Sequence, residues 1–352
     1  MKPLYYSLLV TLLLFSGCGG SNSDEPDGPD GPGIEVPAGY TRVDIVTPGS
    51  LKSLLSPSQL ETITKLFLTG APNASDFETM RDGMPSLAEL DLRMTTITEI
   101  PAYAFWNKEK NARNTVLRTI LLPDSVIKIK EQAFRYCSGL ERVDLSSKLT
   151  EIEECAFYLC KNLKMIELPE SLLRIESDAF AGCELLVAVA LPSSLEYLGF
   201  NVFNSCLRLE KITIPTKVQV INPGCFRNCS ILSEVQLSVG LKTIGKQVFM
   251  ECGLLKKVDV PEGVELIDSH AFDLCLALTE VSLPSTLKEI GREVFVNCPL
   301  ETIICSAPVP PIIGGPHASS MRLGALLKVP AASIEAYKSA EGWNGFQNIV
   351  PL

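Results

Sequence analysis

The chain has few of the residues on which most enzyme mechanisms and nucleic-acid interfaces depend. It has 2 histidines and 2 tryptophans among 352 residues, and its 31 Lys and Arg are outnumbered by 41 Asp and Glu, for a formal net charge of −10. Nucleic acids and anionic membrane surfaces are bound through an excess of Lys and Arg. The composition therefore argues against a nucleic-acid partner and against direct binding to an anionic membrane.

Sequence motifs for catalysis and for cofactors are also missing. His270 and His317 belong to no triad or metal motif, no glycine-rich phosphate loop follows an expected strand, and no serine nucleophile elbow occurs. Closely spaced cysteines, such as Cys155 and Cys160, have no histidine nearby that would complete a zinc site. We therefore expect no enzymatic activity, no cofactor and no bound metal.

The apolar run at the N-terminus is too short to cross a membrane. It covers residues 4–15, whereas a spanning helix needs roughly 20 apolar residues. Lys2 precedes it, as in a secretory signal. The run ends in Phe15-Ser16-Gly17-Cys18, which resembles the bacterial lipobox, although Phe15 replaces the more usual Leu. We expect residues 1–17 to be a signal peptide and Cys18 to be lipidated; the alternative is an ordinary signal with a chance cysteine.

A segment rich in Gly, Pro, Ser and Asp follows over residues 18–37. Such residues bury too little apolar surface to fold, so we expect a flexible acidic tether. Residues 23–25, Ser-Asp-Glu, resemble the signal that sends lipoproteins of some Gram-negative anaerobes to the outer face, although acids are common in any linker. We expect an exported outer-membrane lipoprotein that is surface-exposed and touches the membrane only through its lipid, because several acyl chains anchor stably.

One pattern recurs through most of the remaining chain. A phenylalanine recurs every 23 residues, and a cysteine follows each one by three positions. The phenylalanines are Phe134, Phe157, Phe180, Phe203, Phe226, Phe249, Phe272 and Phe295, and the cysteines are Cys137, Cys160, Cys183, Cys206, Cys229, Cys252, Cys275 and Cys298. Phe105 precedes the series by 29 residues, because six residues are inserted within 106–116. A period of 23 lies in the range of leucine-rich repeats.

The spacing within one repeat predicts the shape of its coil. Leu163-x-x-Ile166-x-Leu168 has the form of a leucine-rich-repeat strand, whose residues two apart point to one face. Pro169 ends this strand, and a second short extended stretch follows at 172–175. The Ala-Phe-x-x-Cys segment is expected to close the coil as a helical or 3₁₀ turn. Stacked coils would bury their apolar sides in one continuous core.

The recurrent LPxSLxxI and AFxxCxxLxxV segments, clearest between Phe134 and Leu283, resemble the BspA-like leucine-rich-repeat family of bacterial surface proteins. Residues 60–92 resemble the family's entry segment and residues 328–350 its closing segment, so the resemblance covers roughly residues 40–352. It implies a β-rich solenoid of the α/β class, capped at both ends. It also implies surface binding, with partners that vary among members.

These features divide the chain into five predicted segments, since a solenoid needs atypical units at its open ends. They are the signal peptide 1–17, the tether 18–37, an N-terminal cap 38–92, the repeat array 93–306 and a C-terminal cap 307–352. We expect Tyr337, Trp343 and Phe346 to form the apolar underside of the second cap rather than a ligand cage. The insertion within 106–116 is expected to be a surface loop, with a contribution to binding as the alternative.

Twelve cysteines in an exported chain would normally indicate disulfides. Eight of them, however, occupy one repeated apolar position, where a free thiol serves as a compact hydrophobic side chain. We therefore expect reduced core thiols, with isolated bridges between neighbouring coils as the alternative.

The concave strand face is the expected binding surface, because solenoids bind through it. Its outward side chains flank the central aliphatic residue of each strand. The candidate residues are Arg142, Asp144, Met165, Glu167, Lys211, Thr213, Glu234, Gln236, Lys257, Asp259, Glu280 and Ser282, with Ala188 and Ala190 between them. The row is polar and has no aromatic residue, so it suits a protein or peptide ligand better than a sugar.

The functional hypothesis from sequence is thus a lipid-anchored, adhesin-like protein that recognises a host or bacterial protein. Two alternatives stay open. One is a glycan-capture lipoprotein that works with an outer-membrane importer, and the other is an envelope scaffold without an external ligand.

Overall fold

The computed structural model describes residues 35–314 and 324–352. Residues 37–352 form one compact unit. The predicted signal peptide, the lipidation site Cys18, nearly all of the tether and His317 lie outside the described residues, so the predictions made for them stay predictions.

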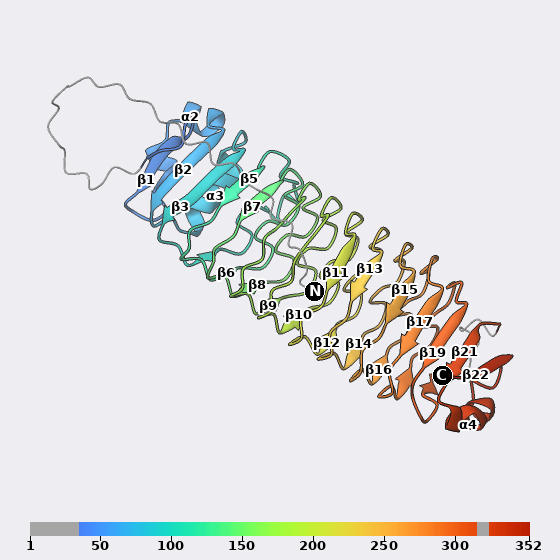
Figure 1. Ribbon diagram of the computed structural model, residues 1–352. Coiled ribbons are helices and arrows are strands. Elements are labelled where there is room, and N and C mark those ends of the chain that lie inside the picture. Colours follow the sequence, from blue (N-terminus) through green and yellow to red (C-terminus); the bar gives the residue numbers. More distant parts are fainter. Residues whose placement is uncertain (1–34, 315–323) are drawn as a thin grey trace, which may run out of the picture. The chain divides into compact units, whose positions relative to one another are not determined.

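From Pro37 onward the chain winds as a solenoid of stacked coils, and every strand pairing in the described part is parallel (Figure 1). The first row of strands consists of β1 (Thr41–Ile45), β2 (Lys65–Gly70), β3 (Glu89–Thr95), β5 (Thr119–Leu121), β7 (Arg142–Asp144), β11 (Lys211–Thr213), β13 (Glu234–Gln236), β15 (Lys257–Asp259), β17 (Glu280–Leu283), β19 (Thr302–Cys305), β21 (Leu326–Val329) and β22 (Asn348–Pro351). This arrangement confirms the predicted solenoid of 23-residue coils.

The second extended stretch of each coil forms another parallel row. It consists of β4 (Glu99–Ile100), β6 (Lys128–Ile129), β8 (Glu151–Ile152), β9 (Arg174–Ile175), β10 (Tyr197–Leu198), β12 (Val220–Ile221), β14 (Thr243–Ile244), β16 (Leu266–Ile267), β18 (Glu289–Ile290) and β20 (Ile312–Ile313). In each strand one residue points out and its partner, an Ile or Leu, points into the core, as the alternation of a strand requires. Only β20 departs, because Ile313 is half-buried.

The predicted phenylalanine ladder forms the spine of the core. From Phe105 to Phe295 consecutive rings stack nearly parallel, with centroids 5.1 to 5.6 Å apart and interplanar angles of 3° to 17°. Each ring is essentially inaccessible to solvent. At the N-terminal end Phe77 closes the ladder edge-on, with its centroid 5.8 Å from that of Phe105. The coils therefore share one apolar interior.

The cysteine position forms a second ladder beside the rings. In each regular coil the thiol donates to the backbone carbonyl of the phenylalanine one coil earlier, as in Cys160 Sγ to Phe134 O at 3.2 Å and Cys183 Sγ to Phe157 O at 3.3 Å. Every cysteine of the described residues is free and buried, which agrees with the expectation of reduced thiols. Burial raises the pKa of these thiols, for Cys229 to about 12, so they stay protonated.

The turn that carries each phenylalanine differs in detail from the expected helical or 3₁₀ turn. It keeps 3₁₀-like bonds, such as Cys137 N to Phe134 O at 3.0 Å. Two left-handed residues interrupt it, Gln132 with φ 56° and Tyr136 with φ 59°. Their amides bond instead to the next coil, at 2.9 Å from Gln132 N to Glu154 O and 2.8 Å from Tyr136 N to Tyr158 O. The turns thereby form a further hydrogen-bonded ladder along the stack.

This left-handed pair occurs in all eight regular coils, two residues before and two residues after the phenylalanine. Only Gly182 and Gly224 among these positions are glycines. The other positions carry side chains in a conformation that costs roughly 1 kcal/mol or more. Because the strain recurs at one register, the hydrogen bonds between coils must outweigh it.

Helices cover the N-terminal end of the stack. They are α1 (Leu51–Leu54), α2 (Pro57–Thr62) and α3 (Ala74–Gly83). Capping boxes begin two of them, Ser56 with Gln59 at α2 and Asn73 with Asp76 at α3. The buried Asp76 carboxylate also accepts the Gly49 amide at 2.7 Å and the Leu51 amide at 2.9 Å, which fixes α1 against α3.

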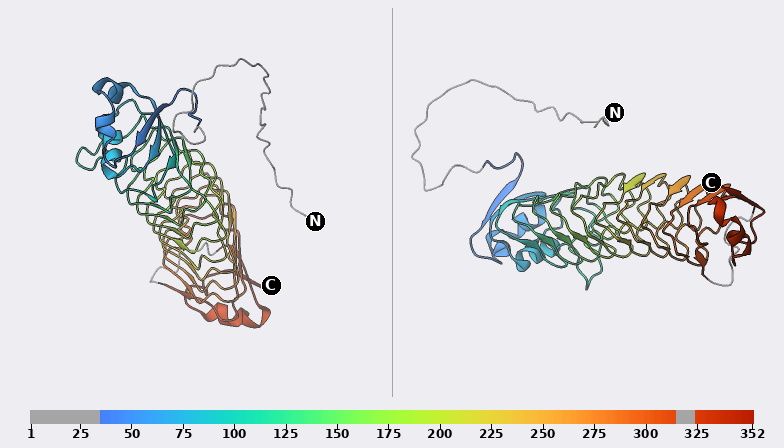
Figure 2. Two further views of the ribbon diagram at one scale, coloured as in Figure 1. Left: turned by 90° about the vertical axis from the view of Figure 1, so that its left-hand side faces the viewer. Right: turned by 60° about the horizontal axis from the view of Figure 1, so that its bottom comes forward.

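The C-terminal end is covered by η2 (Ala331–Ser333) and α4 (Ile334–Ser339), which Figure 2 shows beside the last strands. Tyr337 and Trp343 are fully buried and meet edge-on, with centroids 5.1 Å apart. The Tyr337 hydroxyl donates to Ala307 O and Trp343 Nε1 donates to Pro311 O, each at 2.8 Å. These aromatics are thus packing residues of an end cap, as the sequence predicts.

The ladder makes a clear prediction for the middle of the stack. Replacing Phe203 by Ala should lower the free energy of unfolding by about 3–5 kcal/mol, because the cavity has stacked rings on both sides. The matched control is Phe200→Ala in the same coil, since this ring is 47% exposed and outside the ladder. Denaturant titration followed by circular dichroism measures both, and equal losses would contradict the ladder.

The repeated left-handed positions in the turns allow a second prediction. Gly224 has φ 69°, and a Cβ built there would collide with the Asn201 side chain. Gly224→Ala should therefore cost about 1–2 kcal/mol. Gly253→Ala should be neutral or slightly stabilising, because Gly253 lacks a positive φ and its nearest contact would be 3.7 Å away. Thermal unfolding of the two variants compares them directly.

Candidate binding surface

The outward side chains of the first strand row, here called the strand face, contain the residues that the sequence singles out. Their neighbours in the strands, such as Val143, Ile212 and Val258, are buried. Strand pairing aligns the outward residues of adjacent coils into two columns, with Lys211 opposite Glu234 and Thr213 opposite Gln236. The structure thus brings these candidates together on one surface, while their role in binding stays a prediction.

Much of the charge on the strand face is already paired within the protein. Arg142 donates to both carboxylate oxygens of Asp144 at 2.7 Å. Lys257 lies 2.9 Å from Glu280 and 3.4 Å from Asp259, and these carboxylates raise the pKa of its ammonium. Exposed pairs of this kind add little stability, but they reduce the charge that the surface offers to a partner.

A few charges on the strand face have no such partner. Lys211, Glu234 and Glu167 form no ion pair with any described residue. All three are exposed. They are three charges on this face that a ligand can engage without breaking an internal ion pair.

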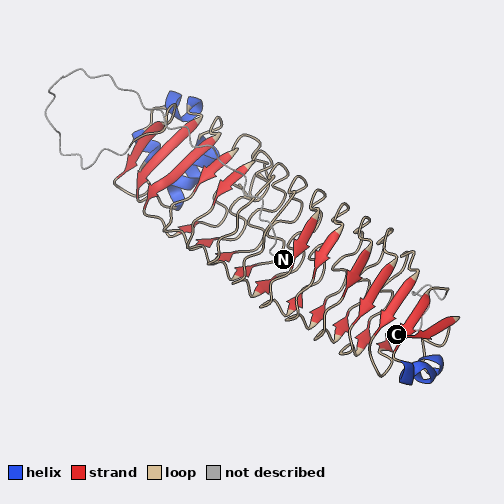
Figure 3. Cartoon of the chain, in the orientation of Figure 1, coloured by secondary structure: helices blue, strands red, loops and turns tan. Residues whose placement is uncertain are grey.

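The first strand row is interrupted between β7 and β11, and β13 and β15 are not paired either, which the sequence does not indicate. Between β7 and β11 the chain forms only an isolated bridge from Met165 to Ala188, and Figure 3 shows loops where strands stand elsewhere. The outward positions of these two coils carry Met165, Glu167, Ala188 and Ala190. Ala and Glu are weak strand formers, and neither offers a β-branched side chain to a cross-strand neighbour.

A hollow of about 760 Å³ opens in the strand face at this interruption. Its lining consists of Asp124, Glu141, Arg142, Val143, Asp144, Leu145, Ser147, Lys164, Met165, Glu167, Leu168 and Pro169. Four of the twelve predicted binding residues therefore share one concavity, namely Arg142, Asp144, Met165 and Glu167. Met165 is 64% exposed and provides an apolar contact surface in this concavity.

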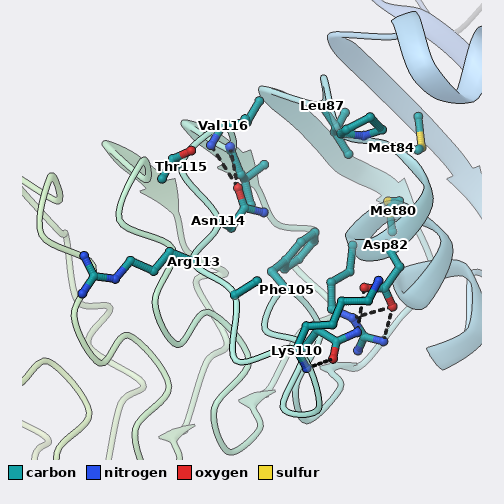
Figure 4. A pocket seen from close by; sticks show the side chains of 15 residues that line it. Met80, Asp82, Met84, Leu87, Phe105, Lys110, Arg113, Asn114, Thr115 and Val116 are labelled. Atoms are coloured by element: carbon teal, nitrogen blue, oxygen red, sulfur yellow. Dashed lines mark hydrogen bonds and ion pairs between the residues drawn. The ribbon is translucent and has the colours of Figure 1, made fainter.

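A smaller hollow of about 220 Å³ lies between α3 and the inserted residues (Figure 4). The insertion is anchored, since Asn107 Nδ2 donates to Asp82 at 2.8 Å and Arg81 donates to the carbonyl of Tyr103 at 3.0 Å. Burial opposes ionisation of Asp82, but the bonds from Arg81 and Asn107 outweigh it and lower its pKa. The insertion is thus a loop held against the N-terminal cap.

Beside this loop, Arg135 lies against three aromatic rings. Its guanidinium is 4.8 Å from the ring centre of Trp106, 4.9 Å from that of Tyr136 and 4.7 Å from that of Tyr158. Cation–π contacts of this kind stabilise desolvated arginines. Trp106 is buried, so the cluster secures the loop and leaves no open aromatic platform.

The described residues contain no cluster of His, Cys, Asp and Glu that is arranged to hold a metal ion. None of their helices has both the length and the apolar character that a membrane span requires.

Comparison with known proteins adds evidence on ancestry. The family model described as "BspA type Leucine rich repeat region" matches residues 98–231 and 198–313 in 6 copies, which together cover more than half of the chain. No match is found among curated proteins.

Several solved structures are similar. A leucine-rich-repeat protein of T. pallidum is 31% identical over 45% of this chain and 72% of its own, with a TM-score of 0.41. A leucine-rich-repeat protein of Bacteroides ovatus is 24% identical over 73% of this chain and 77% of its own, with a TM-score of 0.49. A leucine-rich cell-surface protein of Faecalibacterium prausnitzii is 22% identical over 70% and 73%, with a TM-score of 0.40.

Proposed function

Because the chain belongs to the BspA-type leucine-rich-repeat family, we propose that it is a lipid-anchored binding protein on the bacterial cell surface. In this proposal it acts as an adhesin and recognises a host or bacterial protein through the strand face. The lipobox-like Cys18 and the acidic tether support surface display.

The observation that carries the proposal is the alignment of outward polar side chains at fixed spacing along the strand face. Main-chain pairing holds the side chains of the paired strands, and the core beneath supports the whole row, before any ligand arrives. A preorganised surface binds with less loss of conformational entropy than a flexible one. Unpaired charges at Glu167, Lys211 and Glu234 add a pattern that a protein partner can complement.

One observation favours a second candidate, a glycan-capture protein. A hollow of about 640 Å³ lies on the second strand row, where β10 and β12 are not paired, and is lined by Glu196, Tyr197, Lys217, Gln219, Val220 and Asn222. It combines an aromatic ring with carboxylate and amide groups, as sugar sites do. Arg174 already lies 4.2 Å from the centre of the Tyr197 ring, so part of that ring is occupied.

A binding screen with the purified chain separates these candidates. We expect binding to one or more extracellular-matrix or bacterial surface proteins, and little binding on a glycan array. Lys211→Glu should weaken the protein interaction at least tenfold, because it reverses an unpaired charge on the strand face. Lys211 is a cleaner site than Lys257, whose reversal would also break internal ion pairs.

The matched control for this screen is Lys246→Glu, an equally exposed lysine that lies outside the strand face. Equal losses in both variants would indicate non-specific charge effects. Glycan binding that disappears with Tyr197→Ala, in the absence of protein binding, would replace the proposal by the second candidate. If the chain bound neither proteins nor glycans, an envelope scaffold would be the remaining hypothesis.

The anchor is tested by cell fractionation. The native chain should sediment with outer membranes and be cleaved by protease added to intact cells. Cys18→Ser should shift the chain to the soluble fraction, whereas Ser21→Ala in the tether should not. Replacing Asp24 and Glu25 by Asn and Gln should leave the lipid in place but prevent cleavage by protease added to intact cells. If the added protease still cleaved this variant, a role for these acids in export to the outer face would be contradicted.

A further inference from the structure

We propose that the hollow between β7 and the following coil is a docking site for an extended peptide segment in which an apolar side chain is flanked by Lys or Arg. This inference rests on the proposed function, because it takes the ligand of the strand face to be a protein. It goes beyond that function by locating one contact of the protein ligand in this hollow and by stating the chemistry of the ligand segment that binds there.

The hydrogen-bond ladder is open beside β7. Between β5 and β7 the parallel ladder continues to the end of the strand, with Arg142 N bonded to Arg118 O and Leu122 N bonded to Asp144 O, both at 3.0 Å. One coil later the equivalent bonds would join residues 141–145 to residues 165–167. None of these bonds forms in residues 35–314.

The open ladder leaves backbone groups that face the hollow. In a parallel strand, alternate residues direct their N–H and C=O groups to opposite neighbours. Arg142 and Asp144 bond to β5, so Val143 directs its groups towards the coil of Met165. Such groups require partners, and an extended peptide main chain supplies donors and acceptors of this kind.

The floor of the hollow is apolar. Val143 is buried there, Leu145 and Leu168 are half-buried, and Met165 is largely exposed. Methionine adapts its shape to irregular partners. A volume of about 760 Å³ lies within the usual range of binding pockets, so a large aliphatic or aromatic side chain fits with part of its backbone.

The rim of the hollow is acidic. The rim carries four carboxylates and two cations. The carboxylates are those of Asp124, Glu141, Asp144 and Glu167, and the cations are those of Arg142 and Lys164. Asp144 neutralises Arg142, and Glu141 lies 2.7 Å from Arg118 and 3.7 Å from Lys164. Glu167 forms no ion pair within the described residues and is exposed. The acidic rim therefore attracts a cationic neighbour of the inserted side chain.

The lining also disfavours other occupants. It contains no aromatic residue on which a sugar ring could stack. An anionic ligand would meet the excess of carboxylates. A basic peptide with an apolar centre satisfies the backbone groups, the floor and the rim together.

Fluorescence anisotropy with three labelled peptides of equal length tests the site. Their central residues are Lys-Leu-Lys, Lys-Ser-Lys and Glu-Leu-Glu, in identical Gly-Ser flanks. With the full chain, we expect Lys-Leu-Lys to bind at least tenfold more tightly than either of the others. Equal affinities, or preference for the acidic peptide, would overturn the proposal.

Two variants and a control locate the binding. Met165→Ser and Glu167→Lys should each weaken the Lys-Leu-Lys peptide about tenfold. Glu289→Lys should leave its affinity unchanged, because Glu289 is an exposed acid of β18 in the second strand row, outside the strand face and the hollow. A loss in Glu289→Lys that matches the loss in Glu167→Lys would mean diffuse electrostatic attraction and would contradict the proposal.

Amide hydrogen exchange provides an independent test of the open hydrogen-bond ladder. In the free chain the amides of Val143, Leu145 and Met165 should exchange faster than those of strands β17 and β19, which are paired on both sides, and the peptide should slow them specifically. If the Lys211→Glu variant no longer bound a protein partner and the Met165→Ser variant still bound it, this site would be refuted and the proposed function would stay intact. Loss of every protein interaction in the screen would refute both.

Discussion

Everything in this molecule depends on the fact that a single coil cannot bury its own apolar side. Each coil contributes one phenylalanine, one buried thiol and a few aliphatic side chains, and these become a core only when the neighbouring coils supply the other half. The rings stack 5.1 to 5.6 Å apart, close to the spacing of parallel strands, so side-chain and main-chain contacts repeat with the same step. Residues at each register therefore share one environment along the stack, which explains the strict 23-residue period.

The same dependence explains why the turns tolerate backbone strain. A left-handed Gln, Asp or Leu is unfavourable by itself, yet in the seven coils from Gln132 to Leu274 each such residue lets its amide reach the next coil. In these coils the strain and the hydrogen bond that outweighs it are repeated together. This explains how most of these positions can dispense with glycine, although glycine has the easiest access to that conformation.

The repeating part of the fold follows from the sequence because its signals are redundant. The spacing of phenylalanine and cysteine defined the coil, the alternation around residues such as Ile212 defined the outward row, and the repeated apolar register predicted free thiols. The left-handed turns were not predictable, since residues as different as Gln132 and His270 occupy one position there. The interruption after β7 was missed because Leu163, Ile166 and Leu168 fit the repeat, and the outward Met165 and Glu167 differ from those of the paired strands in no way that marks an opening.

That interruption also leaves backbone groups and side chains without partners from a neighbouring coil. In a regular coil the backbone groups, the apolar side chains and many of the charges are satisfied by adjacent coils, as in the pairs Lys128–Glu151 and Lys161–Glu184. A ligand that approaches such a surface must compete with internal partners or accept solvent-exposed contacts that contribute little. Where the ladder is open, the protein has left its own interactions incomplete, and a ligand gains contacts without displacing any. A solenoid can therefore confine recognition to a few coils while the rest of the array acts as a rigid support.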